Sequence, residues 1–264
     1  MKKNKFLVVS LIFLFIILIQ PQNFQSIVAT FTQNDLASQL NISNSPGEKN
    51  SDSSGSYQTQ IEGLKSKSYD GKNQVITVNT RAQFTEAERS LEKGSWEKYS
   101  DLDFLNRVGT AEAMLGQDLM PINPREDISG VKPTGWKNKK IIFNGKQDYL
   151  YNRSHLIGFQ LSGENANVKN LFTGTRALNA NFEDEKSSMV YYENLVANYI
   201  KTTGHHVRYR VTPIFKHVEL VCRGVRIEAQ SIEDDTVSFD VYIFNIQPGY
   251  TINYLTGSSQ SDNH

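Results

Sequence analysis

The stretch VRYRVTPIFKHVELVCRGVRIEAQ, residues 207–230, contains two strand-like patterns on either side of a short polar turn. In its second half, Val225, Ile227 and Ala229 fall on one side of an extended chain, and charged or polar residues fall on the other. A third strand-like segment follows at residues 239–246 and ends in a Pro-Gly turn. These three segments predict the centre of an antiparallel sheet.

Helices and further strands are expected before this sheet. The apolar residues of 189–201 recur at three- and four-residue spacing, which predicts a helix. Thr85 stands three residues before Glu88, a capping box that predicts another helix start. A helix is also expected at residues 106–115, and strands at residues 74–78, 140–144 and 148–152. Because helices and strands are interspersed without a regular βαβ alternation, the sequence predicts an α+β fold, a central antiparallel sheet with flanking helices.

Residues 1–29 have the layout of a secretory signal peptide. Lys2, Lys3 and Lys5 precede an apolar run from Phe6 to Ile19, and polar residues follow it. The run is shorter than the ~20 residues that span a bilayer. We therefore expect a secreted protein without stable membrane association after cleavage, with an uncleaved membrane anchor as the alternative.

The rest of the chain divides by composition. Residues 30–68 are expected to form a flexible linker, because residues 40–60 are rich in Ser, Asn, Gly and Gln and carry little apolar surface. Residues 69–257 are expected to form one domain, and residues 258–264 a disordered tail. The only cysteine, Cys222, cannot close an internal disulfide, so stability must come from core burial.

The net charge limits how this chain can hold a polyanion. The sequence has 28 basic and 28 acidic residues, and loss of the three lysines within residues 1–29 would leave a net charge of −3. A protein that binds nucleic acid through its overall charge is usually basic, so any polyanion site here must be a local patch. One stretch fits, because it contains a single acid, Asp148, among six cations: Lys132, Lys137, Lys139, Lys140, Lys146 and Arg153.

Several kinds of catalytic site are excluded by their missing motifs. The sequence contains no phosphate-binding loop, G-x-S-x-G elbow, H-E-x-x-H pair or Cys/His zinc cluster. Of the five histidines, His155 stands out, because Arg153 precedes it and apolar residues follow it. An imidazole beside a guanidinium suits proton abstraction from a water that attacks a phosphate. A structural histidine remains the alternative, and the others are expected at turns or at the terminus: His205, His206, His217 and His264.

The segment Asn152-Arg153-Ser154-His155 resembles the D-R-G-H motif of the DNA/RNA non-specific endonucleases, in the N-R-S-H form of streptodornase-type secreted DNases. The resemblance covers roughly residues 70–257. It implies a ββα-metal catalytic motif and endonucleolytic hydrolysis of DNA, with RNA as a further candidate substrate, that leaves a 5′-phosphate. Further segments carry it in order: Asn106–Gly109, Asp118–Pro121, Arg125–Ile128, Lys132–Trp136, Asn170–Arg176, Val211–Ile214 and Gln247–Tyr250.

The resemblance also implies roles for individual residues. His155 becomes the general base, and Asn179 the single protein ligand of Mg²⁺, for which Mn²⁺ is expected to substitute. Glu193 matches the family's acidic residue that orients metal-bound water, with a structural ion pair as the alternative. Asn170 matches a position that assists near the scissile phosphate, with a plain turn residue as the alternative. Two arginines are expected to bind substrate, Arg153 and Arg176.

The spacing of the expected metal-site residues constrains the local structure. On one straight helix, the 14 residues from Asn179 to Glu193 would separate them by roughly 21 Å. A break is therefore expected at residues 183–188. Nucleic acid is the expected partner, and no obligate protein partner is inferred. The rival interpretation is a secreted binding or mitogenic protein that keeps the nuclease fold and acts on host surfaces without catalysis.

Overall fold

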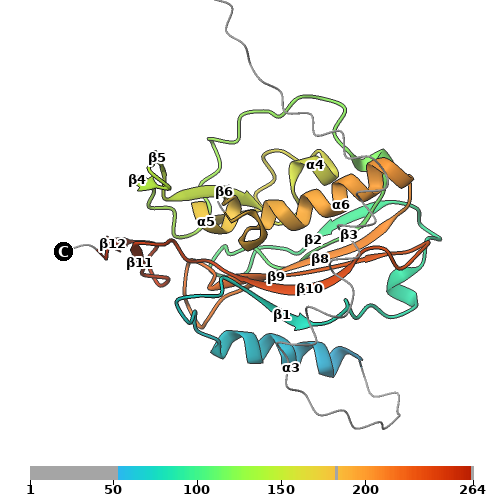
Figure 1. Cartoon of the computed structure of the whole chain (residues 1–264), viewed down its shortest axis with the longest axis horizontal. Coiled ribbons are helices and arrows are strands. Elements are labelled where there is room, and N and C mark those ends of the chain that lie inside the picture. Colours follow the sequence, from blue (N-terminus) through green and yellow to red (C-terminus); the bar gives the residue numbers. More distant parts are fainter. Residues whose placement is uncertain (1–52, 182–183, 263–264) are drawn as a thin grey trace, which may run out of the picture. The chain divides into compact units, whose positions relative to one another are not determined.

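The sheet expected from residues 207–230 is the centre of the fold (Figure 1). The computed structural model describes residues 53–181 and 184–262, so the predicted signal peptide lies outside the described residues. Strands β8 (Val207–Ile214), β9 (Gly224–Ser231) and β10 (Ser238–Phe244) pair antiparallel in the middle of a six-stranded sheet of order β1-β10-β9-β8-β3-β2. The predicted α+β class is confirmed.

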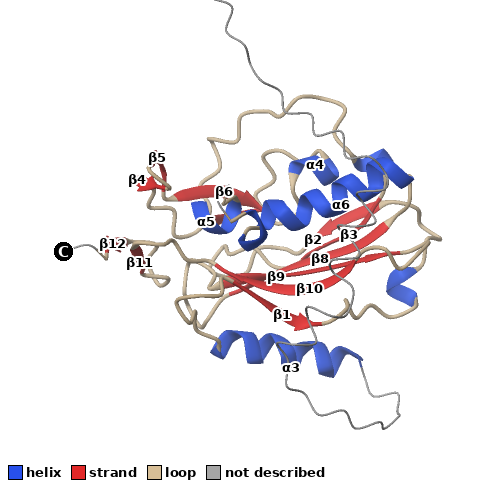
Figure 2. Ribbon diagram, in the orientation of Figure 1, coloured by secondary structure: helices blue, strands red, loops and turns tan. Residues whose placement is uncertain are grey.

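The remaining elements surround this sheet (Figure 2). The other strands of the six-stranded sheet are β1 (Val75–Asn79), β2 (Trp96–Tyr99) and β3 (Ala111–Leu115). Three two-stranded ladders join β4 (Lys140–Phe143) to β5 (Lys146–Tyr149), β6 (Tyr151–His155) to β7 (Leu171–Thr175), and β11 (Tyr250–Ile252) to β12 (Ser259–Ser261). The helices are α3 (Ser53–Ser66), α4 (Phe159–Ser162), α5 (Arg176–Asn179) and α6 (Met189–Thr203).

One face of the sheet is apolar and lies under α6. Val211 of β8 pairs with Ile227 of β9, and both side chains are fully buried. Tyr192 of α6 packs on Phe239 of β10, with ring centroids 5.1 Å apart. This burial follows from the alternation of the strands, which places every second residue on the same side.

The opposite face of the sheet is charged, yet it is buried under α3. Arg226 is fully buried and donates two hydrogen bonds to the carboxylate of Asp240, while its Nη2 also donates to Gln60 of α3. The hydroxyls of Tyr57 and Thr212 lie 2.6 Å apart. Since a buried charge is costly unless it is paired, the polar contacts from α3 help to stabilise this face.

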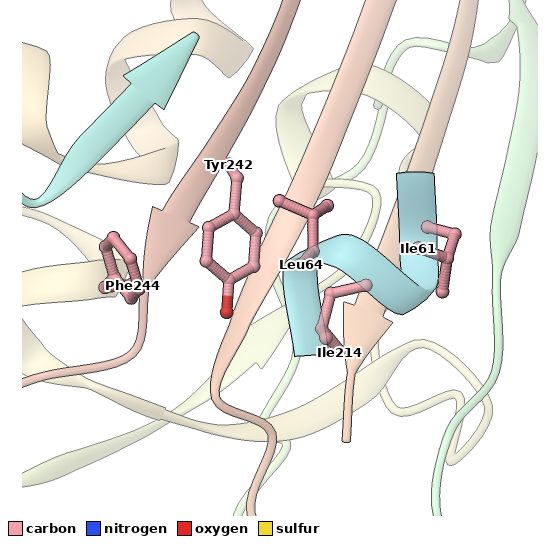
Figure 3. Close-up of a cluster of buried hydrophobic side chains, with 5 residues drawn as sticks. All are labelled: Ile61, Leu64, Ile214, Tyr242 and Phe244. Carbon is pink, nitrogen blue, oxygen red and sulfur yellow. The ribbon is translucent and has the colours of Figure 1, made fainter. Parts of the chain in front are cut away.

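The structure overturns the predicted linker from residue 53 onward. Ile61 and Leu64 of α3 pack with Ile214, Tyr242 and Phe244 of the sheet, and Figure 3 shows the five side chains together. The segment is polar overall, so its composition resembles a linker. Its few apolar residues nevertheless share one helical face, and that face binds the sheet.

We expect Leu64→Ala to destabilise the domain strongly, because Leu64 is 4% exposed in the cluster. A buried Leu→Ala change costs about 2–5 kcal/mol, enough to lower the melting temperature by several degrees in a domain of this size. Thermal unfolding followed by circular dichroism measures the shift. Gln58→Ala, on the exposed side of the same helix, is the matched control and should change the free energy of unfolding by less than about 0.5 kcal/mol. Equal melting temperatures for the two variants would show that α3 does not support the fold.

Three local predictions also differ from the structure. Residues 111–115 form a central strand rather than the end of a helix, because β3 completes hydrogen-bonded ladders with both β2 and β8. Thr85 and Glu88 form the expected reciprocal capping bonds, but only a 3₁₀ turn, Ala87–Arg89, follows them. The predicted disordered tail is ordered through residue 262, because β12 pairs with β11.

Candidate active site

A cavity of about 570 Å³ lies where β6, α5 and α6 come together. The strands β6 and β7 pair antiparallel and lead directly into α5, so these three elements form a ββα unit. The cavity brings together four of the six site residues predicted from the sequence: Arg153, His155, Asn179 and Glu193. Its other lining residues are Arg125, Ile128, Trp136, Asn138, Asp148, Tyr149, Tyr151, Asn152, Gly158, Gln160 and Val190.

His155 ends β6 and is held in one orientation. Its Nε2 lies 2.9 Å from the backbone carbonyl oxygen of Asn165. Because a carbonyl only accepts, the neutral ring carries its proton on Nε2 and keeps the lone pair on Nδ1. Burial lowers the pKa of His155 from its ordinary value of 6.5, the hydrogen bond to Asn165 opposes that effect, and the charge of Arg125 adds to it. The imidazole is therefore biased toward the neutral form that a base requires.

Arg125 is a cavity residue to which the sequence analysis gave no role. It lines the cavity, its guanidinium carbon lies 5.1 Å from the centre of the Phe159 ring, and its charge acts on both His155 and Glu193. The backbone N–H of Glu126 donates to the side chain of Asn165 at 2.9 Å, which ties this loop to the carbonyl that orients His155. The only available signal was the family-like segment that contains Arg125.

Glu193 lies on the first turns of α6 and is 7% exposed. Gln160 Nε2 donates to its Oε2 at 2.7 Å. Burial raises the pKa of this carboxyl to about 7, although the Gln160 hydrogen bond and the charge of Arg125 both lower it. The carboxylate also approaches the backbone closely, since a Cβ at Gly158 would lie 2.7 Å from the Glu193 side chain. A buried carboxylate of this kind is stabilised by any cation that enters the cavity.

Asn179 is the last residue of α5, and the chain does break between it and α6. A 3₁₀ turn, Glu185–Ser187, separates α5 from the start of α6 at Met189. The predicted break is therefore confirmed. In the described ranges, no group of three or more His, Cys, Asp or Glu side chains could hold a metal ion. One amide oxygen beside one carboxylate is instead a donor set that suits an oxygen-preferring cation that keeps most of its water.

The structure uses Arg153 and Asn170 to fix the backbone around the cavity. Arg153 lines the cavity, stacks 4.4 Å from the Trp136 ring centre, and donates from Nη2 to the carbonyl of Ser129 at 2.7 Å. Asn170 is fully buried and bonds through both ends of its amide to the backbone of Ile157. Asn170 is not among the residues that line the cavity, and its amide is used in these bonds, so its expected place near the scissile phosphate stays a prediction.

Arg176 begins α5 and pairs with Asp148 of β5 at 2.6 Å. Asp148 lines the cavity and Arg176 does not, so Arg176 is placed as a link between α5 and the β4–β5 hairpin rather than as a cavity residue. The sequence suggested that Arg153 is the cation that acts on His155. In the structure it is the charge of Arg125, from a distant loop, that lowers the pKa of His155.

The β7–α5 corner is fixed by residues from far along the chain. Asn245 accepts from the N–H of Thr175 at 2.8 Å and donates to the carbonyl of Thr173 at 3.0 Å. Gln247 accepts from the N–H of Ala177 at 3.0 Å. Both clamping side chains are buried, so α5 and Asn179 at its end are held firmly against the central sheet.

Comparison with known proteins identifies similar sequences and structures. The sequence profile of the family described as DNA/RNA non-specific endonuclease matches residues 85–233. The fold is similar to NucA from Streptococcus agalactiae with magnesium bound, at a TM-score of 0.64 and 25% identity over 78% of this chain and 95% of that one. It is also similar to the Sda1 nuclease with a bound zinc ion, at a TM-score of 0.62 and 28% identity over 72% of this chain and 97% of that one.

Proposed function

The chain belongs to the DNA/RNA non-specific endonuclease family, and from this premise we propose that it is a secreted, magnesium-dependent endonuclease in which His155 is the general base. The observation that carries the proposal is the 2.9 Å contact between His155 Nε2 and the Asn165 carbonyl, which leaves Nδ1 to accept a proton in a cavity that also contains Asn179 and Glu193. DNA is the proposed substrate, and RNA is tested beside it.

The residues of the cavity have different roles in phosphodiester hydrolysis. His155 Nδ1 accepts a proton from the attacking water, and the carbonyl of Asn165 stabilises the imidazolium that forms. Arg125 binds the phosphate oxygens, since a guanidinium in the cavity has the charge and shape for them. Arg153 acts as a positioning residue that holds the loop at residues 129–131 beside the substrate.

Asn179 and Glu193 are the residues that would hold the metal. Asn179 would bind the ion through its amide oxygen, and Glu193 would accept hydrogen bonds from the water around it. When bound, a divalent cation neutralises charge that develops on the phosphate and its leaving oxygen. Magnesium is proposed because these donors are oxygens and because NucA, a structural relative, is known with magnesium bound. Manganese should substitute, since it accepts the same ligands.

Secretion is proposed from the N-terminal pattern of a basic start and an apolar run. Among the described residues, no helix combines the length and the apolar character needed to cross a bilayer. Fractionation of producing cells, with N-terminal sequencing of the exported protein, tests the cleavage of residues 1–29. A protein recovered only with membranes and with its full N-terminus would overturn the proposal in favour of the uncleaved anchor.

We expect the purified protein to degrade DNA in the presence of Mg²⁺ and to stop when a chelator is added. The melting temperature should stay nearly constant on chelation, because apolar burial stabilises the core and hydrogen bonds between protein groups hold the corner at Asn245. Gel assays on DNA and RNA in parallel, with thermal unfolding of the same samples, measure both quantities. A folded protein that cleaves neither polymer with Mg²⁺ or Mn²⁺ would favour the noncatalytic binding protein. A large loss of melting temperature on chelation would assign the ion to the fold rather than to the reaction.

A further inference from the structure

The hairpin of β4 and β5 carries an exposed surface beside the cavity. In its antiparallel register Lys140 pairs with Tyr149, and Ile142 pairs with Gln147. Directly opposed residues and their second neighbours share a face, so these four side chains lie on one side of the hairpin. All four residues are exposed, and the large apolar groups are 62% exposed at Ile142 and 52% at Tyr149.

The other side of the hairpin is anchored. Ile141 is buried in a cluster with Leu150 and Tyr151, and Phe143 packs against that cluster. Asn144, at the turn, donates to the side chain of Asn181 at 3.2 Å. The pair between Asp148 and Arg176 adds a second link to the segment around α5. The exposed face is therefore held at a fixed position relative to α5, which carries Asn179.

This exposed face is continuous with the cavity. Tyr149 lines the cavity, as do Trp136 and Asn138, and exposed Lys137 lies between those two in the chain. Lys137 and Lys140 take part in no salt bridge within the described residues. An aromatic ring with two unneutralised cations at the rim of a phosphodiesterase cavity has the chemistry of a single-strand platform, in which the ring stacks on a base and the cations contact phosphates.

We propose that the outer face of the β4–β5 hairpin binds an unpaired nucleotide of the substrate next to the scissile phosphate, with Tyr149 stacked on its base and Lys140 and Lys137 on its backbone. The inference rests on the proposed nuclease function and adds a preference to it. In a duplex both faces of a base are covered by its neighbours, so Tyr149 has nothing to stack on. Single-stranded or locally unpaired nucleic acid is therefore the favoured substrate.

The test measures binding in a His155→Ala background, so that the probes stay intact. The probes are a fluorescent single-stranded oligonucleotide and a blunt duplex of the same sequence, followed by anisotropy at fixed low salt. Tyr149→Ala should weaken single-strand binding by about fivefold or more and leave duplex binding within twofold. Tyr149→Phe keeps the ring and should bind the single strand like the parent.

Two lysine variants provide a matched comparison of charge. Lys140→Ala should weaken binding and reduce the salt dependence of affinity by about one phosphate contact. Lys146→Ala removes the same charge from the same hairpin, but Lys146 pairs with Phe143 on the opposite face, so its effect should be smaller. Circular dichroism of each variant checks that the hairpin change leaves the fold intact.

The inference is overturned if Tyr149→Ala binds the single strand like the parent, if Tyr149→Phe loses as much affinity as Tyr149→Ala, or if duplex binding falls equally. It is also overturned if both lysine variants have the same effect. Failure of the nuclease function is a separate result, because it would appear as wild-type protein that cleaves neither probe with Mg²⁺. If the wild type cleaves both probes and Tyr149→Ala binds the single strand like the parent, the nuclease function is supported and only the proposed nucleotide binding by the hairpin is excluded.

Discussion

His155→Ala should lower the turnover number by at least about 100-fold, because it removes the group that accepts the proton of the attacking water. Some loss of stability is expected too, since the ring is 7% exposed and bonds to the Asn165 carbonyl. That loss should be about 1 kcal/mol, a few degrees of melting temperature. Initial rates measured well below the melting transition separate the two effects.

The pH dependence of the wild-type rate tests the same assignment. Only the neutral imidazole can accept a proton, so the rate should fall as the pH drops through the pKa of His155. Burial and the charge of Arg125 lower that pKa, so the acidic limb from this group should have its midpoint below 6.5. A bound cation acts in the same direction. Arg125→Gln should weaken the substrate complex and move this limb toward higher pH, a shift that a purely structural arginine would not cause.

His206→Ala is the matched control for His155→Ala. His206 is partly exposed, pairs with Glu233 at 2.7 Å, and is not among the residues that line the cavity. Its removal should leave the turnover number within about twofold of the wild type. A near-normal rate for His155→Ala, or an equal loss in both variants, would end the assignment of His155 as the base.

Asn179→Ala should lower the rate at physiological Mg²⁺ by at least about 100-fold, because it removes the only proposed direct protein ligand; loss of a secondary contact alone costs 10- to 100-fold. Titration with Mg²⁺ should show the half-saturating concentration moved upward, with partial recovery at high metal. Glu193→Gln keeps the shape of the side chain and removes its charge, and it should lose about 10- to 100-fold.

Asn194→Ala is the control for both metal-site variants. Asn194 follows Glu193 on α6 but is exposed on the outer side of the helix. It should keep the wild-type rate and the wild-type Mg²⁺ dependence. If Asn179→Ala matched that control in both respects, the metal would have to be held elsewhere. Titration of the Asn179→Ala variant with Mn²⁺, followed by electron paramagnetic resonance, would then show independently of activity whether the variant still binds the ion.

The elements that could be predicted best from the sequence are those in which apolar residues recur at a regular spacing. The alternation of Val225 and Ile227 marks one face of a central strand, and the helical spacing of 189–201 matches α6. The break between Asn179 and Glu193 can also be predicted, because helix geometry fixes how far apart two residues on one helix lie. Periodicity of this kind survives folding, so it can be read before any contact is known.

The missed features depend on contacts between distant segments. Tyr57, Ile61 and Leu64 recur at helical spacing, but the polar residues around them dominate the composition and concealed α3. The cation that acts on His155 is Arg125 rather than its sequence neighbour Arg153, because the Arg153 guanidinium is held against Trp136 and the carbonyls of residues 129 and 131. Such assignments require the tertiary structure.

The clamp on the β7–α5 corner also has a consequence for the timing of synthesis. Every cavity-lining residue lies between Arg125 and Glu193, yet the bonds that fix Asn179 in place come from Asn245 and Gln247. The edge strand β1 likewise cannot join the sheet before β10, its pairing partner, has been synthesised. A nascent chain on the ribosome therefore carries all the reacting groups long before it can arrange them. This order delays catalytic competence until the chain has been synthesised at least through Gln247.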